Sequence, residues 1–237
     1  MSLQALGLNY VDLYLVHWPI AMNPDGNDEK FPKLADGSRD LTPARSHTDT
    51  YKDMEKLLES GKVKAIGVAN YSVRYLEELL RGVSVFPAVN QIENHPLLPQ
   101  QEIVNFCRDN GIHVTAYSPL GSAGRPLTQL PVVRRLAEKR ATTPAVVLLS
   151  WHGKSFCSVI SLSSKLIFSD FSVSSGRSVL AKSVAPSRIE ENCQIIELDE
   201  SELGEINQVV ESLQKSGGST RYVYPAFGVD LGYPDKS

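Results

Sequence analysis

The 237-residue chain is poor in several features, and each shortage excludes a class of protein. No apolar run reaches the roughly 18 residues that a membrane-spanning helix needs, and residues 1–4 do not open a leader with a basic start. The three cysteines are widely spaced and match no metal-ligand pattern, which is typical of reduced thiols in the cytoplasm. The formal net charge is only -3, which favours neither a nucleic acid nor a membrane as partner. These shortages direct the search toward a site for a small molecule.

Two phosphate-binding motifs are also missing. The chain has no G-x-G-x-x-G and no G-x-x-x-x-G-K-[ST], so neither a Rossmann fingerprint nor a P-loop holds a nucleotide here. The histidines have no metal-ligand spacing, and we expect no metal. Glu93 and His95 are expected to face a loop and solvent. A phosphate ligand would need a different arrangement of residues.

What the chain does contain is an alternation of short β-branched apolar runs with stretches of helical spacing. This alternation predicts βα units on a parallel sheet. The predicted strands cover residues 11–18, 65–70, 88–93, 113–118 and 178–184. The predicted helices cover residues 48–60, 73–80, 101–110, 132–139 and 144–152, and a further helix begins near Ser187. Gly61 stands where a glycine ends the first of these helices, and Ser187 with Glu190 reads as a capping box.

Two segments interrupt this rhythm. Residues 23–47 form a connection rich in Pro, Gly and Asp, and loops of this length are functional or disordered. Residues 153–176 are dominated by serine and follow neither the strand nor the helix period for long. The length alone fits one α/β barrel of about 250 residues and equally fits two small domains.

The first three strands end in side chains that suit a ligand. Because parallel α/β proteins bind ligands at the carboxyl ends of their strands, we look for function there. His17 can donate an imidazole N–H to a substrate oxygen and Trp18 can wall an apolar pocket, but both residues fit the margin of the core equally well. Asn70 ends the second strand and Gln91 lies in the third, so neighbouring strands each carry an amide. A buried amide needs a partner, and either a planar carboxamide ligand or the capping of a loop would supply one.

The last two strands lead into groups that suit an anion. Tyr117 offers a flat face to a heteroaromatic ring, and the turn at residues 118–122 offers hydroxyl and backbone N–H donors to a phosphate, although a plain turn has the same composition. Lys182 and Arg188 bracket a predicted helix N-terminus, where free amides and the helix dipole favour anions. A capping box at Ser187 would be structural, and both readings can hold together.

In this order and spacing the segments resemble the aldo-keto reductases. The matching stretches are LGLNYVDLYLVHWP at 6–19, GKVKAIGVAN at 61–70, VNQIENHP at 89–96, AYSPLGS at 116–122 and KSVAPSRIEEN at 182–192. The ending YPAFG at 224–228 is similar to the fungal branch that acts on sugars, glycerol or small aldehydes. The resemblance implies a TIM (β/α)8 barrel, hydride transfer between NADP(H) and a small carbonyl or polyol substrate, a cytoplasmic location and a monomer.

The resemblance also implies roles for single residues. His17 would orient the carbonyl as a catalytic residue, and Trp18 would wall the substrate pocket. The implied cofactor-binding residues are Asn70 and Gln91 at the nicotinamide carboxamide, Tyr117 on the nicotinamide ring, Ser118, Leu120 and Ser122 at the pyrophosphate, and Lys182, Ser183, Arg188 and Asn192 at the adenosine end. Ala69 stands where the family usually has serine, which removes a hydrogen bond worth about 1 kcal/mol.

The chain departs from the family pattern in what it lacks. Family members begin with three βα units before the matching segment, and those units supply an aspartate, a lysine and the tyrosine that acts as general acid. The resemblance therefore implies one partial domain over residues 1–237, an incomplete barrel with impaired catalysis, in which residues 153–176 are an insertion. Open first and last strands would favour association through the sheet edges. A non-catalytic NADP(H)-binding or regulatory protein and a non-functional truncated gene product are the alternatives.

Overall fold

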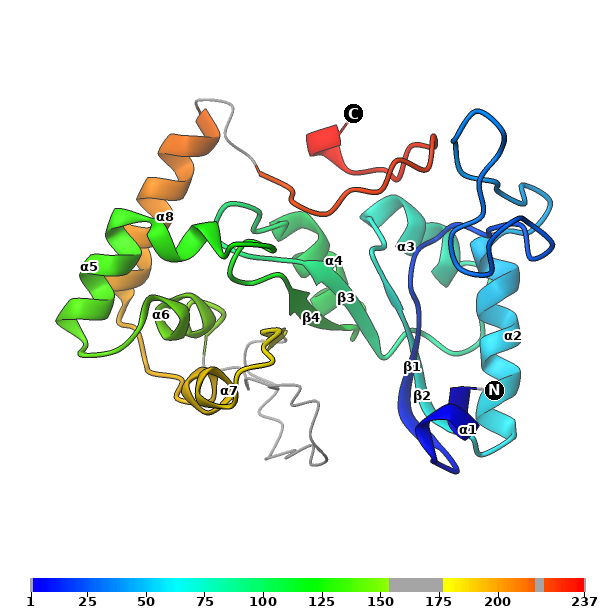
Figure 1. Cartoon of the computed structure of the whole chain (residues 1–237), viewed down its shortest axis with the longest axis horizontal. Helices are drawn as coiled ribbons and strands as arrows, with labels where there is room; N and C mark the ends of the chain where they lie inside the picture. The colour runs from blue at the N-terminus through cyan, green and yellow to red at the C-terminus, as the bar shows by residue number, and fades with distance from the viewer. Residues whose placement is uncertain (1, 154–176, 216–219, 237) are drawn as a thin grey trace. The chain divides into compact units, whose positions relative to one another are not determined.

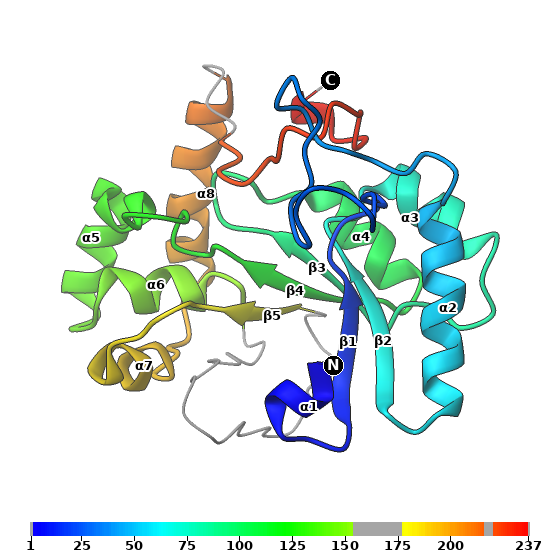
Figure 2. The same ribbon diagram turned by 45° about the vertical axis from the view of Figure 1, so that its right-hand side comes forward.

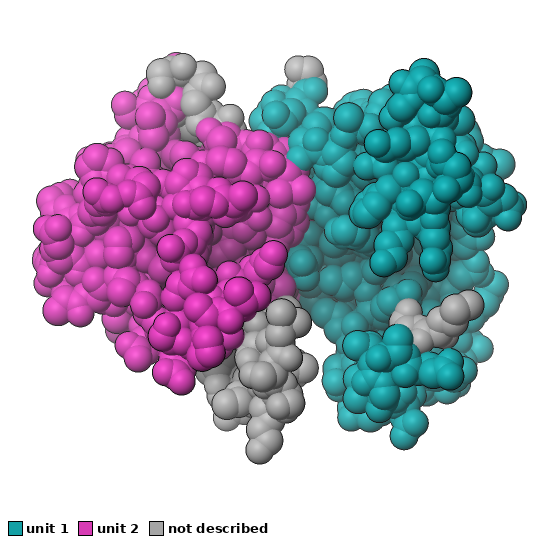
Figure 3. All heavy atoms as spheres, in the orientation of Figure 1, with its two compact units in different colours: residues 1–91, 105–112, 224–237 teal, residues 92–104, 113–223 magenta. Residues whose placement is uncertain are grey.

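The computed structural model describes residues 2–153, 177–215 and 220–236. The sequence predicts that residues 153–176 are an insertion. Residues 154–176 lie outside the part of the chain that the structure describes, so this prediction is not tested. The described chain divides into two compact units, coloured teal and magenta in Figure 3. Unit 1 comprises residues 1–91, 105–112 and 224–237, and unit 2 comprises residues 92–104 and 113–223. Each unit is described by itself.

Strands and helices alternate along most of the chain (Figures 1 and 2), as the sequence predicts. The strands are β1 (Val11–Val16), β2 (Val63–Ala69), β3 (Val89–Glu93), β4 (His113–Tyr117) and β5 (Arg177–Leu180). The helices are α1 (Ser2–Leu6), α2 (His47–Glu59), α3 (Val73–Leu80), α4 (Gln101–Asp109), α5 (Pro131–Lys139), α6 (Pro144–Ser150), α7 (Pro186–Asn192) and α8 (Glu200–Lys215), with 3-10 turns η1 (Pro126–Gln129) and η2 (Pro234–Lys236). The strand order is β1-β2-β3-β4-β5, which is an α/β arrangement compatible with an incomplete barrel. None of the described helices is long and apolar enough to cross a membrane.

Unit 1 is built on parallel pairing of β1 with β2 and of β2 with β3. Val11 pairs with Val63 at one end of the first ladder and Val16 pairs with Val68 at the other. Gly67 permits this close packing, because a Cβ there would lie 2.6 Å from the carbonyl oxygen of Val89. Helix α2 lies beside β2 (Figure 1) and buries Tyr51 and Met54 on one face.

The ends of α2 follow from local chemistry. Ser46 is the N-cap: its hydroxyl accepts a hydrogen bond from the Asp49 backbone, and the Asp49 side chain accepts one in return. The helix ends before Gly61, whose φ of 67° is the left-handed conformation that glycine adopts without cost. The prediction of a terminating glycine at position 61 is therefore confirmed.

Unit 2 joins the parallel pair β4 and β5 to a helical core. The ladder runs from Val114 opposite Arg177 to Tyr117 opposite Leu180. Helices α5, α6 and α8 enclose a cluster of fully buried apolar side chains. Its members with no exposed surface are Ala116, Val133, Leu136, Val147, Leu148, Leu149, Val179 and Ile206. Helix α8 was not among the predicted elements, yet Ile206 and Val210 place it in this core.

The structure corrects two boundaries in unit 2. The last strand ends at Leu180 and does not continue to Val184. Helix α7 begins at Pro186 with Ala185 as N-cap, and no side chain caps it, so the capping box predicted at Ser187 is wrong. Proline has no N–H to lose and its fixed φ suits the first helical position, which moves the helix start ahead of Ser187.

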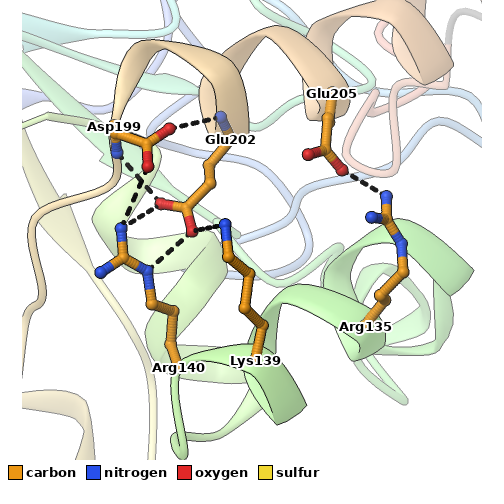
Figure 4. Close-up of polar contacts among 6 residues, drawn as sticks. All are labelled: Arg135, Lys139, Arg140, Asp199, Glu202 and Glu205. Carbon is orange, nitrogen blue, oxygen red and sulfur yellow. Dashed lines mark hydrogen bonds and ion pairs between the residues drawn. The ribbon is translucent and has the colours of Figure 1, made fainter.

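A network of charged groups ties α5 to α8 within unit 2 (Figure 4). The Glu202 side chain is fully buried, and its Oε1 accepts hydrogen bonds from Arg140 Nε at 2.7 Å and Lys139 Nζ at 2.8 Å. Its Oε2 accepts from the Asp199 backbone N–H at 3.0 Å, and the Asp199 carboxylate accepts from the Glu202 backbone N–H at 2.9 Å. Hydrogen bonds from Arg140 and Lys139 hold the pKa of the Glu202 carboxyl well below its usual range.

We predict that Glu202→Gln lowers the melting temperature at neutral pH. The depressed pKa means that the ionised carboxylate stabilises the fold above the ordinary range of Glu, and this contribution is lost as the pH falls through and below that range. The difference between wild type and variant, measured by circular dichroism, should therefore shrink on acidification. Glu205→Gln is the matched control, because Glu205 is partly exposed and pairs only with Arg135 among the ion pairs of Figure 4. A difference that does not change with pH would assign the effect to packing.

Strand β1 exposes side chains on both of its faces. Leu13 is 40% exposed and its neighbour Tyr14, which points to the other face, is 44% exposed. Among the described strands β1 has only β2 as partner. An exposed, apolar edge strand is a template for pairing with another chain.

Leu13→Lys should therefore reduce concentration-dependent association, because a charge on an edge strand opposes pairing with a second chain. Light scattering after size-exclusion chromatography measures the effect. Leu8→Lys is the control, since Leu8 is 52% exposed but lies outside β1. If both variants reduced association equally, the cause would be the added charge in general and not its place on the edge strand.

Candidate functional site

In unit 1, hydrogen bonds join the residues that follow β1 and β2 to each other and to β3. The Asn70 backbone N–H donates to the Gln91 carbonyl oxygen at 2.9 Å. The Asn70 side chain is buried, and its Nδ2 donates to the His17 carbonyl oxygen at 2.9 Å. The structure thus brings His17, Asn70 and Gln91 together at one edge of unit 1.

The Asn70 backbone is in the left-handed region, with φ of 63°. Among residues other than glycine, asparagine adopts this conformation most readily, and such conformations are concentrated at ligand sites. The turn ends β2 at Ala69 and redirects the chain into α3. Asn70 is therefore held by its main chain and by its side chain at once.

Trp18, the residue after His17, packs against the C-terminal segment of unit 1. Its ring meets the ring of Phe227 edge to face, with centroids 5.5 Å apart, and only 8% of Trp18 is exposed. The Arg74 guanidinium pairs with the Asp230 carboxylate at 2.7 Å and fixes this segment against α3. The His17 side chain is exposed at the end of β1. The contact of Phe227 with Trp18 could not be predicted from the sequence, because nothing local to Phe227 indicates it.

In unit 2, Tyr117 ends β4 and leads into a compact turn. Ser118 and Ser122 are both left-handed, with φ of 52° and 64°. Gly121 donates its N–H to the Ser118 carbonyl at 2.9 Å, and a Cβ on Gly121 would lie 2.9 Å from Pro126 Cγ. Leu120 is buried, whereas Ser122 is exposed. The turn therefore presents a hydroxyl and main-chain groups on a tightly constrained backbone.

Two basic residues of unit 2, Lys182 and Arg188, follow β5 at the edge of the sheet where this turn lies. Tyr117 lies opposite Leu180 in the ladder, so Lys182 and Ser183 continue from β5 beside the end of β4. Lys182 is exposed in the connection between β5 and α7, Arg188 is exposed in the first turn of α7, and Asn192 is buried at its end. The Ser183 hydroxyl accepts from the Ala185 N–H at 3.2 Å, which shapes the turn before α7.

Glu93 and His95 do not face solvent, so that expectation is wrong. Both side chains are fully buried, with His95 Nε2 at 3.1 Å from Glu93 Oε1. The Glu93 carboxylate also accepts the backbone N–H groups of Tyr222 and Val223, each at 2.9 Å. A buried carboxylate is tolerated when it accepts this many hydrogen bonds. Glu93 thereby anchors the segment that leads to the C-terminus.

Two further findings concern the chemistry available. No group of three His, Cys, Asp or Glu residues in the described ranges is placed to hold a metal ion. Cys107 is fully buried next to Asn90, and burial raises the pKa of its thiol to about 12, so it is a poor nucleophile. The polar groups at the strand ends consist mainly of amides, hydroxyls and exposed cations.

The chain belongs to the aldo/keto reductase family: the Aldo/keto reductase family profile matches residues 1–211. It is 51% identical over 236 residues to a D-galacturonate reductase of Hypocrea jecorina, covering 100% of this chain and 70% of that protein. It is 40% identical over 232 residues to a glycerol 2-dehydrogenase (NADP(+)) of Saccharomyces cerevisiae, covering 94% and 66%. The resemblance predicted from the sequence is confirmed.

Solved structures agree with this assignment. An aldose reductase of Giardia lamblia superposes with a TM-score of 0.81 at 35% identity, covering 98% of this chain and 71% of that one. An aldo-keto reductase complexed with NADPH superposes with a TM-score of 0.70 at 28% identity, covering 95% and 60%. The chain thus spans about two thirds of the length of the proteins that it matches.

We predict a graded loss of stability on replacing Asn70. Asn70→Gly keeps the left-handed backbone but loses the bond to His17, at a cost of about 1 kcal/mol. Asn70→Ala loses the bond and adds backbone strain, at about 2 kcal/mol in total. Urea unfolding measures both values. Equal losses would mean that the left-handed φ of Asn70 imposes no cost on alanine.

Proposed function

We propose that this chain binds NADP(H) at its strand ends and acts in the reduction of small aldehydes or ketones, or in the reverse oxidation of polyols. The observation that carries the proposal is the hydrogen-bonded set of His17, Asn70 and Gln91 in unit 1. These bonds run through the main-chain carbonyls of His17 and Gln91, and they bring an imidazole and two amide-bearing residues to one edge of the parallel strands. That combination suits a nicotinamide carboxamide next to a substrate carbonyl. Membership of a family of oxidoreductases supports the same reading.

The residues present fit an NADP(H) cofactor in their chemistry. In unit 1, Asn70 and Gln91 would pair with the nicotinamide carboxamide. In unit 2, Tyr117 offers a flat face on which a nicotinamide ring would stack. The left-handed turn that contains Ser118, Leu120 and Ser122 would meet the pyrophosphate with hydroxyl and N–H donors. When bound, the cofactor supplies the hydride that reduces the carbonyl carbon.

The exposed cations of unit 2 fit the adenosine end. Lys182 and Arg188 would contact a 2′-phosphate, while Ser183 and Asn192 complete that part of the site. NADPH carries this 2′-phosphate and NADH does not, so two cations next to it would favour NADPH. The relative named as an NADP(+)-dependent glycerol dehydrogenase supports this preference.

The substrate side of the site would be partly apolar. His17 would orient the carbonyl through an imidazole N–H, and the packed rings of Trp18 and Phe227 would limit the size of the pocket. Relatives named for D-galacturonate and for glycerol point to sugars and short polyols as the substrate class. The widely spaced cysteines fit a cytoplasmic location, which is part of this proposal.

Proton delivery is the weak step in these 237 residues. No tyrosine, lysine or aspartate here matches the family's general acid and its partners. General acid catalysis contributes about 10²- to 10⁴-fold, so we propose that the chain by itself turns over slower than its longer relatives by factors of that order. A chain that binds NADP(H) without catalysis is the second candidate, favoured by this same gap.

We predict that the wild-type chain quenches its tryptophan fluorescence on titration with NADPH and oxidises NADPH only slowly with a nitrobenzaldehyde. Arg188→Ala should weaken NADPH binding about tenfold and leave NADH binding unchanged, because it removes a charged contact to the 2′-phosphate. Arg81→Ala, which removes an exposed arginine at the C-cap of α3, is the matched control. Absence of NADPH binding would refute the proposed function, and rapid turnover would refute the impairment.

A further inference from the structure

The buried amide of Asn90 forms hydrogen bonds with both backbone groups of Tyr71 in unit 1. Asn90 lies in β3 with no exposed surface, and its Nδ2 donates to the Tyr71 carbonyl oxygen at 2.9 Å. Its Oδ1 accepts from the Tyr71 N–H at 3.4 Å. Exchanging the amide oxygen and nitrogen would set oxygen against oxygen at the Tyr71 carbonyl, so the main chain fixes the orientation of the amide.

Tyr71 needs this partner because it stands just outside the sheet. Strand β2 ends at Ala69, and α3 begins only at Val73, so the Tyr71 backbone belongs to neither ladder nor helix. Tyr71 is itself fully buried. An unpaired N–H or carbonyl in that position would cost the free energy of a lost hydrogen bond. The side chain of Asn90 supplies both missing partners.

The contact bears directly on Asn70, the residue before Tyr71. Asn70 has its N–H on the Gln91 carbonyl and a φ of 63°, and the Asn90 contact fixes the peptide unit that follows it. With both sides of the residue held, the direction of its side chain is determined. Without Asn90, the φ and ψ angles of Asn70 and Tyr71 would be less restricted.

We propose that Asn90 is a positioning residue for the nicotinamide end of the cofactor, acting through the Tyr71 backbone on Asn70. This inference rests on the proposed function, because it takes Asn70 as a partner of the nicotinamide carboxamide. Asn90 itself contacts Tyr71 and Cys107, the latter with Nδ2 at 3.8 Å from Sγ. Its effect is therefore on the half of the cofactor that Asn70 meets and not on the adenosine half.

Two ligands separate this role from general stability. NADPH carries both halves, whereas adenosine 2′,5′-bisphosphate carries only the adenosine half. Asn90→Leu should weaken NADPH binding about tenfold by calorimetry and change binding of the bisphosphate less than about twofold. Asn90→Thr suits a strand, and its single hydroxyl can meet only one Tyr71 group, so its loss should be intermediate.

Cys107→Ala is the matched control for destabilisation at the same place. It removes the sulfur next to the Asn90 amide and leaves both bonds to Tyr71, so it should lower the melting temperature without changing the affinity for either ligand. Three results would overturn the proposal. Asn90→Leu could bind both ligands more weakly by the same factor, it could fold and bind NADPH as the wild type does, or both Asn90 variants could fail to fold. Failure of the wild-type chain to bind NADPH would instead refute the proposed function on which it rests.

Discussion

The arrangement of unit 1 depends on how the ends of its parallel strands satisfy their buried backbone groups. A strand that leaves a sheet exposes N–H and carbonyl groups that the ladder no longer pairs. Here the amide of Asn90 pairs with Tyr71, and the amide of Asn70 pairs with His17. These two side chains pair backbone groups that lie just beyond the ends of β1 and β2, and this edge is where the ligand-binding residues of the family are expected.

Unit 2 meets a related constraint with charge. Helix α8 begins beside the end of α5, where main-chain and acidic groups come together. Glu202 accepts bonds from Arg140, Lys139 and the Asp199 backbone, so its burial is compensated on every side. The helical core beneath is apolar throughout. In both units, buried polar side chains that form several hydrogen bonds mark places where elements distant in the sequence meet.

The sequence predicted the elements whose signals are local and missed those that depend on distant partners. The strands themselves and the Gly61 terminus are readable, because apolar runs mark a strand and because glycine adopts a left-handed turn without cost. The end of the last strand was nevertheless placed four residues too far along the chain, at Val184 in place of Leu180. The start of α7 was misplaced because Ser187 was preferred to Pro186 as the start signal. Glu93 was misjudged because its partners at Tyr222 and Val223 lie about 130 residues further along the chain.

The same distinction applies to the candidate site. Polar residues at strand ends could be identified from the alternation of apolar runs, and the family resemblance supplied their roles. Phe227 and Asn90 could not be identified in this way, because their importance comes from Trp18 and Tyr71. A buried polar residue in an apolar run was nevertheless a signal, and it applied to Asn90 as much as to its neighbour Gln91. Helix α8 also had its signal, since Leu203, Ile206 and Val210 recur at helical spacing.

The seclusion of Cys107 has a practical consequence. Its thiol contacts Asn90, has no exposed surface and carries a strongly raised pKa, whereas Cys193 is exposed. Of the two cysteines that the structure describes, an alkylating reagent should modify Cys193 at once and reach Cys107 only when unit 1 opens locally. The delay between the two modifications, followed by mass spectrometry, would time the opening of the native protein without any introduced label.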